Sequence, residues 1–116
     1  MQIRSEQMEA LDHEAQRRFH LRLVKFLRDQ LPEETVEISD DVLLARIIEA
    51  EHRANKYDIV TEIGITQFVL LGFLAGPDFD EEPDVHTFLS NPAYEPDEKI
   101  DALVDELLEL EEESEG

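Results

Sequence analysis

Five carboxylates lie within the seven residues from Asp78 to Asp84, a density that could serve a metal ion. Carboxylate oxygens are the ligands that Ca²⁺ prefers, and the spacing resembles the start of a calcium-binding loop. Two positions depart from that loop, because Pro83 stands where the turn glycine belongs and Leu89 where the bidentate glutamate belongs. We therefore predict no metal site here, and a calcium-responsive regulator stays as an alternative function.

The histidines and serines show no recognisable catalytic arrangement. His13 and His20 are seven residues apart, and neither they nor His52 match a metal-binding motif such as HExxH. None of the four serines stands in a GxSxG or SxxK motif, and the chain has no cysteine. No glycine-rich phosphate loop is present. The sequence thus predicts no catalytic residue, no cofactor and no enzymatic activity.

The strongest signal in the composition is negative charge. The 116 residues include 30 acidic and 10 basic ones, a net charge of −20, and residues 57–116 hold 18 of the acids with Lys99 as their sole base. Such charge disfavours nucleic acid and anionic membranes, and it attracts basic proteins. A salt-adapted surface would give the same acidity, but it would acidify both halves of the chain.

We therefore predict a protein partner with a basic patch. The carboxylates expected to contact it lie in the acidic loop and on the outer face of the last helix, and they are Asp78, Asp80, Glu81, Glu82, Asp84, Asp105 and Glu109.

Apolar residues recur at helical spacing along most of the chain, and few prolines or glycines interrupt them. The pattern predicts helices over residues 5–30, 40–56 and 62–75, a short helical turn at 83–90 and a last helix from about Pro96. Ser5, Ser39 or Asp40, and Thr61 are the expected N-caps of the first three helices.

The segment 62–75 is apolar on nearly every side, which is typical of a helix in the middle of a bundle. A buried strand is the competing interpretation, but the segment is long for one. Gly64 and Gly72 could let neighbouring helices approach closely. We predict an all-α fold, a compact bundle of four to five helices around residues 62–75, forming one domain over residues 1–110 with a frayed acidic tail at 111–116.

The first predicted helix has one charged residue among its apolar ones. Met8, Leu11, Ala15, Phe19, Leu23 and Phe26 form a stripe, and Arg22 falls within it. Because a buried arginine needs a carboxylate or carbonyl partner, we predict a buried ion pair at Arg22. The stretch 19–27 is apolar on more than one side, and the segment 62–75 is apolar on nearly every side. A second copy of the chain could cover part of both, so a homodimer or a self-assembling structural protein is a further alternative.

Several separate positions together resemble a family. They are Ile3, Arg4, Gln7, Met8 and Leu11, then His20 to Arg22, Tyr57 and Ile59, Phe68 to Phe73, and the turn Gly76-Pro77-x-Phe79-Asp80 followed by Pro83. In this order they resemble the small helical proteins that accompany type VI secretion and polymorphic-toxin gene clusters in Gram-negative bacteria. The resemblance brings no established catalytic residues with it. It implies a helical, partner-dependent protein, which is an accessory protein for an effector, an adaptor, or an immunity protein for a secreted toxin.

The residues of the turn at 76–80 also have a structural interpretation. Gly76 can adopt the left-handed conformation that ends a helix, and Pro77 prevents its continuation. We expect Phe79 to tuck under the bundle and Asp80 to cap the next turn. No apolar run reaches the length of a membrane helix and no signal peptide is evident, so the expected compartment is the cytoplasm.

Overall fold

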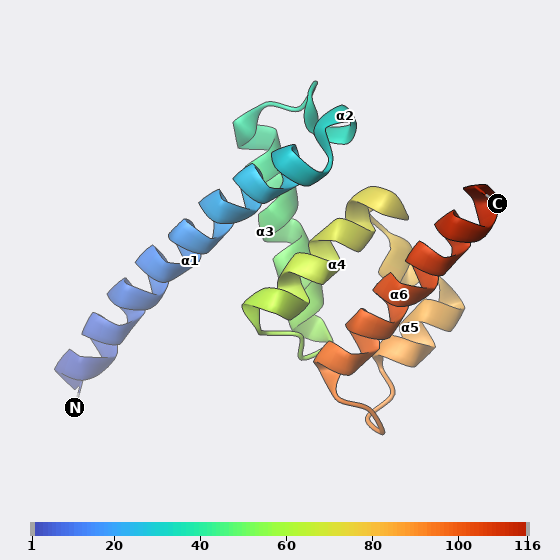
Figure 1. The fold of residues 1–116 in the computed structure, drawn as a ribbon. Coiled ribbons are helices and arrows are strands. Elements are labelled where there is room, and N and C mark those ends of the chain that lie inside the picture. Colours follow the sequence, from blue (N-terminus) through green and yellow to red (C-terminus); the bar gives the residue numbers. More distant parts are fainter. Residues whose placement is uncertain (1, 116) are drawn as a thin grey trace. The chain divides into compact units, whose positions relative to one another are not determined.

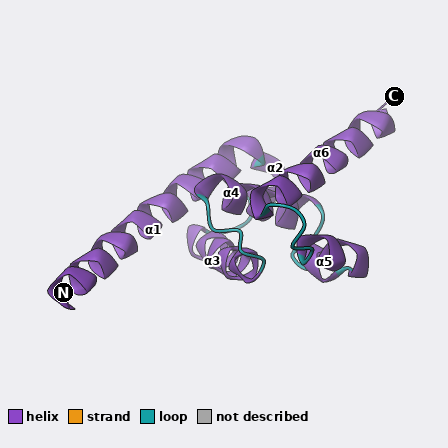
Figure 2. Cartoon of the chain, turned by 90° about the horizontal axis from the view of Figure 1, so that it is seen from below, coloured by secondary structure: helices purple, strands orange, loops and turns teal. Residues whose placement is uncertain are grey.

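A computed structural model describes the backbone of residues 2–115 and the side chains of residues 13–109. Within that part of the chain every regular element is a helix and no strand occurs, so the predicted all-α fold is confirmed (Figure 2). The elements are α1 (Gln2–Gln30), α2 (Pro32–Thr35), α3 (Asp40–Lys56), α4 (Glu62–Leu74), the 3-10 turn η1 (Phe79–Glu81), α5 (Pro83–Leu89) and α6 (Pro96–Glu115).

The chain groups into two compact units, residues 1–48 and 49–116, where the sequence analysis expected one domain over residues 1–110. Helix α3 runs unbroken through the boundary (Figure 1). At the other end of the chain α6 continues to Glu115, past residue 110, where an acidic tail was expected to begin. Among the described residues, no helix combines the length and apolar character that a bilayer-spanning segment requires.

The first unit is held at its turn by Arg28, near the end of α1. Its guanidinium donates to the carbonyl oxygens of Thr35 (2.9 Å) and Ile38 (2.8 Å) and to the Asp40 carboxylate (2.6 Å). The Arg28 side chain thus donates to backbone carbonyls at and after the end of α2, which have no partner within a helix, and it links them to Asp40, the first residue of α3. Ser39 accepts from the Val42 amide at 3.3 Å, which confirms Ser39 as the cap of α3.

The apolar stripe of α1 is narrower than predicted. Phe19, Leu23 and Leu27 are buried, but Ala15 and Arg22 are exposed, and the side chains of Met8 and Leu11 lie outside the described residues. The predicted burial of Arg22 is therefore wrong. Arg22 shares a helix side with Phe26, which is only half-buried, so it lies at the edge of the stripe and its long side chain reaches solvent. Helix α1 also begins at Gln2, so Ser5 lies inside it and is no N-cap.

The second unit begins in α3, whose end is fixed by a Schellman motif. The Ile59 amide donates to the Ala54 carbonyl (3.1 Å) and the Asp58 amide to the Asn55 carbonyl (3.1 Å). Asp58 takes the left-handed conformation that this motif requires, with φ 63°. Ala54 and Ile59, the positions between which a hydrophobic contact commonly accompanies this motif, are both fully buried.

Helix α4 begins at the predicted cap, because the Thr61 hydroxyl accepts from the Gly64 amide at 3.0 Å. It buries Gly64, Ile65, Phe68, Val69 and Leu71 and lies beside α6 (Figure 1). Neither end of α4 is fully buried, however, since Ile63 is 74% exposed and Leu74 is 38% exposed. The segment is thus a helix, as predicted, with a buried side and exposed ends.

The two glycines of α4 differ in what surrounds them. A methyl group on Gly64 would lie 2.6 Å from Asp97 Oδ1 and 2.8 Å from Ile59 Cγ2, whereas one on Gly72 would meet nothing within 4 Å. The close approach predicted for both glycines therefore occurs only at Gly64. Asp97 cannot easily retreat, since its Oδ2 accepts from the Thr61 hydroxyl at 2.6 Å.

We predict opposite effects for alanine at these two positions. Gly72→Ala should raise the free energy of unfolding by about 0.5–1 kcal/mol, because alanine has the better helix propensity and its methyl group meets no neighbour. Gly64→Ala should lower it by about 1–2 kcal/mol, because overpacking outweighs that gain. Urea unfolding of both variants checks this. A stabilised Gly64→Ala would show that Asp97 and Ile59 move aside at little cost.

Candidate functional site

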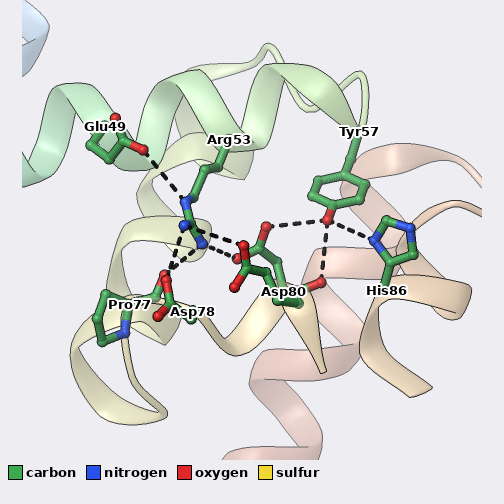
Figure 3. Close-up of polar contacts among 8 residues, drawn as sticks. Glu49, Arg53, Tyr57, Pro77, Asp78, Asp80 and His86 are labelled. Carbon is green, nitrogen blue, oxygen red and sulfur yellow. Dashed lines mark hydrogen bonds and ion pairs between the residues drawn. The ribbon is translucent and has the colours of Figure 1, made fainter. Parts of the chain in front are cut away.

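The acidic turn after α4 is bound to α3 through Arg53 (Figure 3). The Arg53 guanidinium lies 2.7 Å from Asp80 Oδ1 and 2.9 Å from Asp78 Oδ1, and it donates to the Pro77 carbonyl at 3.0 Å. Glu49 and Glu81 lie farther away, at 3.6 and 3.7 Å. Arg53 thus partly neutralises a turn that the sequence presents as free negative charge.

Tyr57 contacts the same aspartate from the next turn of α3. Its hydroxyl lies 3.1 Å from Asp80 Oδ2 and 3.1 Å from His86 Nδ1, and the two rings of Tyr57 and His86 meet edge to face (Figure 3). The hydroxyl carries one proton, which it donates to the Asp80 carboxylate, so the Nδ1–H of His86 is the donor to the hydroxyl oxygen. Both carboxylate oxygens of Asp80 are therefore used inside the protein.

Local sequence explains how these groups meet. Arg53 and Tyr57 are four residues apart, so they lie on one side of α3. Gly76, at φ 111°, ends the preceding helical segment as predicted, and Phe79 turns inward against Phe68 with ring centroids 4.8 Å apart. The 3-10 turn η1 contains both Phe79 and Asp80 and directs Asp80 inward, where its side chain is 6% exposed. The expected helix-capping role of Asp80 is wrong, because its carboxylate binds α3 instead.

This arrangement shifts two pKa values upward. Burial is the largest cause, and together with the negative charge of Asp80 and the hydrogen bond to it, burial raises the pKa of the Tyr57 hydroxyl to about 12. Burial alone would lower the pKa of Arg53, but the hydrogen bond to Asp80 and the charges of Asp80, Asp78 and Glu81 raise it above its ordinary value. Neither group is tuned to exchange a proton near neutral pH, so the cluster has the properties of a structural tie.

Alkaline pH should break this tie at Tyr57. The pKa of the Tyr57 hydroxyl is about 12 in the folded chain and about 10 in the unfolded one. The contribution of this hydroxyl to stability is therefore intact below pH 10 and is lost between pH 10 and 12. Between pH 10 and 12 the free energy of unfolding of wild type should fall by about 2 kcal/mol more than that of Tyr57→Phe. This figure is smaller than the full pKa shift would give, because the Tyr57 side chain is partly exposed. Phenolate absorbance in Tyr94→Phe, which leaves Tyr57 as the sole tyrosine, should titrate near pH 12. A midpoint near 10 would contradict the contact.

The alternative of a calcium site receives no support from the geometry. Among the described residues, no group of three or more histidine, aspartate or glutamate side chains is arranged to hold a metal ion. In the turn itself, Arg53 and Tyr57 already bind the oxygens of Asp80, and Arg53 binds Asp78. A cation would have to displace both side chains of α3.

The structure divides the seven carboxylates predicted for partner binding into two groups. Asp78, Asp80 and Glu81 contact Arg53, and of these Asp80 is buried. Glu82 and Asp84 are exposed at the start of α5, and Asp105 and Glu109 are exposed on α6. The predicted surface is thus available to solvent except at Asp80.

An open groove of about 520 Å³ lies within the second unit, beside the acidic turn. Its walls come from the end of α4, from η1, from α5 and from the middle of α6. Most of the lining side chains are apolar, and they include Leu71, Phe79, Val85, Phe88, Leu103 and Leu107. Three carboxylates, those of Glu82, Asp84 and Glu106, also line it. No local pattern in the sequence indicates this groove, because its lining residues come from several separate elements.

Two basic residues also escaped the sequence analysis. No role is predicted above for Arg53, and Lys99 is counted there only as the single base of residues 57–116. Lys99 is 4% exposed and donates to the carbonyls of Leu89 (2.6 Å) and Asn91 (2.8 Å). Its position four residues before Leu103 placed it on the apolar stripe of α6, and that was a usable signal of burial.

Comparison of the sequence with family models and with curated proteins, and of the fold with solved structures, identifies no match to this chain.

Proposed function

We propose that this chain is a non-enzymatic protein-binding module that recognises a basic surface on its partner. The observation that carries the proposal is the charge of residues 49–116, which include 20 acidic residues and three basic ones. Sixteen of those carboxylates have described side chains, and all are exposed except the buried Glu51 and Asp80 and the half-buried Asp97.

The three basic residues do little to offset this outward charge. Arg53 faces four carboxylates at 2.7–3.7 Å, and Lys99 is buried against carbonyl oxygens, which leaves Lys56 as the exposed base of this unit. The surface is therefore anionic nearly throughout. A field of one sign speeds the encounter with a cationic partner and rejects anionic ones.

The resemblance described above supports a secreted bacterial toxin, or a protein exported with one, as the partner. An immunity protein binds the toxin and blocks it, whereas an adaptor binds it and delivers it for export. Both roles place the chain in the cytoplasm, where it meets the partner before export. Both also require binding alone, in agreement with a sequence that offers no catalytic motif.

Affinity capture from the native host tests the proposal. The purified chain is immobilised at about 0.01 M salt, where charges act over about 30 Å, and bound proteins are eluted at rising ionic strength. We expect a basic protein that binds tightly at low salt, is released as the ionic strength rises, and is not retained by an unrelated protein of equal net charge. Retention of the same proteins on that control, or of none, would overturn the proposal. Co-expression with the captured protein then separates the roles, since only an immunity protein relieves toxicity.

A further inference from the structure

The groove of the second unit has walls that are themselves helical ridges. Leu71 of α4 and Ala75, which caps the end of that helix, are four residues apart, and α6 contributes Leu103 and Leu107, also four apart. Val85 and Phe88 of α5 stand three residues apart on the remaining side. Residues at these spacings share one side of a helix, so each wall presents a short row of apolar side chains to the groove.

Rows of this kind favour a helical occupant. The ridge that side chains form along one helix packs into the groove between ridges of its neighbours, and amphipathic helices bind apolar grooves on many proteins in this way. The volume of about 520 Å³ is within the range of natural binding pockets, and the groove is open and not enclosed, so a helix can lie along it.

The rim of the groove decides the charge of that occupant. Glu82, Asp84 and Glu106 are all exposed and line the groove, and neither Arg53, Lys56 nor Lys99 does. Exposed carboxylates beside an apolar floor complement a helix that carries basic side chains at the edges of its apolar face.

We propose that this groove is the docking site for an amphipathic helix of the partner protein, apolar where it enters the groove and bearing lysine or arginine at its edges. The inference rests on the proposed function and names the part of the partner that is recognised. In this proposal Glu82, Asp84 and Glu106 contact the basic side chains of the docked helix. Asp105 and Glu109 add only to the negative electrostatic field around the second unit.

A designed peptide serves as the probe. It is about 15–20 residues long, because shorter peptides form little helix in water, with leucine at i, i+3, i+4 and i+7 and lysine at the flanking positions. A scrambled peptide of identical composition controls for charge alone. Titration into the full chain, followed by methyl NMR, should move the signals of Val85, Leu103 and Leu107 with the helical peptide only. Shifts confined to amides of the outer carboxylates, or equal shifts with the scrambled peptide, would overturn the inference.

A variant that fills the groove provides a second measurement. Ala102 lines the groove and is exposed, so Ala102→Phe should block the site with little damage to the core. We expect it to weaken peptide binding by at least about tenfold. Ala93→Phe, at an exposed position outside the groove, is the matched control and should change binding by less than about twofold. Unchanged affinity in a folded Ala102→Phe would overturn the inference.

Two triple variants with the same change of net charge test the rim. Glu82→Gln/Asp84→Asn/Glu106→Gln should weaken binding by roughly tenfold, whereas Glu98→Gln/Asp105→Asn/Glu109→Gln should weaken it by about twofold. Equal losses would show that only net charge matters and would overturn the groove assignment. Self-association that Ala102→Phe abolishes would also overturn it, in favour of a second copy of the chain as occupant.

The groove and the proposed function can fail separately. A host partner that binds wild type and Ala102→Phe equally contradicts the groove and leaves the binding function intact. Specific docking of the helical peptide, with no partner recovered from the host, contradicts the function and leaves the groove a competent site.

Discussion

Replacement of Arg53 by methionine is expected to lower the free energy of unfolding by about 3 kcal/mol. The reason is the carboxylate of Asp80, whose side chain is 6% exposed and would lose its closest cation, at 2.7 Å. Removing one partner of a buried ion pair leaves an uncompensated buried charge, which costs about 3–5 kcal/mol. The lower end applies because the Arg53 side chain is itself 20% exposed. Urea unfolding of the purified chain measures the change.

Arg18→Met is the matched control for this variant. Arg18 makes an ion pair with Glu14 at 3.7 Å, but both side chains are about 70% exposed. An exposed pair of this kind contributes little, so the same substitution should change stability by less than about 0.5 kcal/mol. Equal effects of the two substitutions would contradict the claim that Asp80 is the group that needs Arg53.

The double variant Arg53→Met/Asp80→Leu separates the cost of an orphaned charge from the value of the pair. Replacing both members of a buried pair by apolar residues is often neutral, so the double variant should recover most of the stability that Arg53→Met loses. The Tyr57 hydroxyl keeps an acceptor in that variant, because the backbone carbonyl of residue 80 lies 3.2 Å away. A double variant less stable than Arg53→Met would contradict the orphaned-charge explanation and would mean that Asp80 stabilises the fold through other contacts, such as the Tyr57 hydroxyl.

The elements that sequence predicted well are those fixed by neighbouring residues. The bounds of α3 follow from a capping Ser39 and an apolar face that ends near Lys56, and those of α4 follow from Thr61. Each signal operates within one or two helical turns, so a single sequence contains it in full. Helix α2 was missed because its four residues are too few to show a period.

The contacts that sequence did not predict join residues far apart in the chain. Arg53 meets Asp80 across 27 positions, and no local pattern indicates which of the 30 acids it will choose. The same limit explains the error at Asp80, since a capping aspartate and an aspartate turned inward by a buried Phe79 look alike in sequence. The groove also depends on how α4, α5 and α6 lie together, so it could be seen only in the folded chain.

Lys99→Met should lower the free energy of unfolding by about 3 kcal/mol. The Lys99 ammonium is the donor that the carbonyls of Leu89 and Asn91 use, at 2.6 and 2.8 Å, where α5 ends. Methionine keeps the apolar length of the side chain but donates nothing, and each buried carbonyl left without a partner costs about 1–3 kcal/mol. The loss also removes a positive charge from the C-terminal end of a helix, where the macrodipole favours cations.

Lys56→Met makes the same chemical change at an exposed position and should cost less than about 1 kcal/mol, including the dipole effect at the end of α3. Hydrogen exchange distinguishes a local from a global effect. If Lys99 ties the segment after α5 to α6, amides of residues 89–95 should exchange faster in Lys99→Met than in Lys56→Met. Equal exchange in the two variants would mean that water replaces the Lys99 ammonium at both carbonyls. Lys99, the single base of residues 57–116, would then be buried at this place without being needed for the fold.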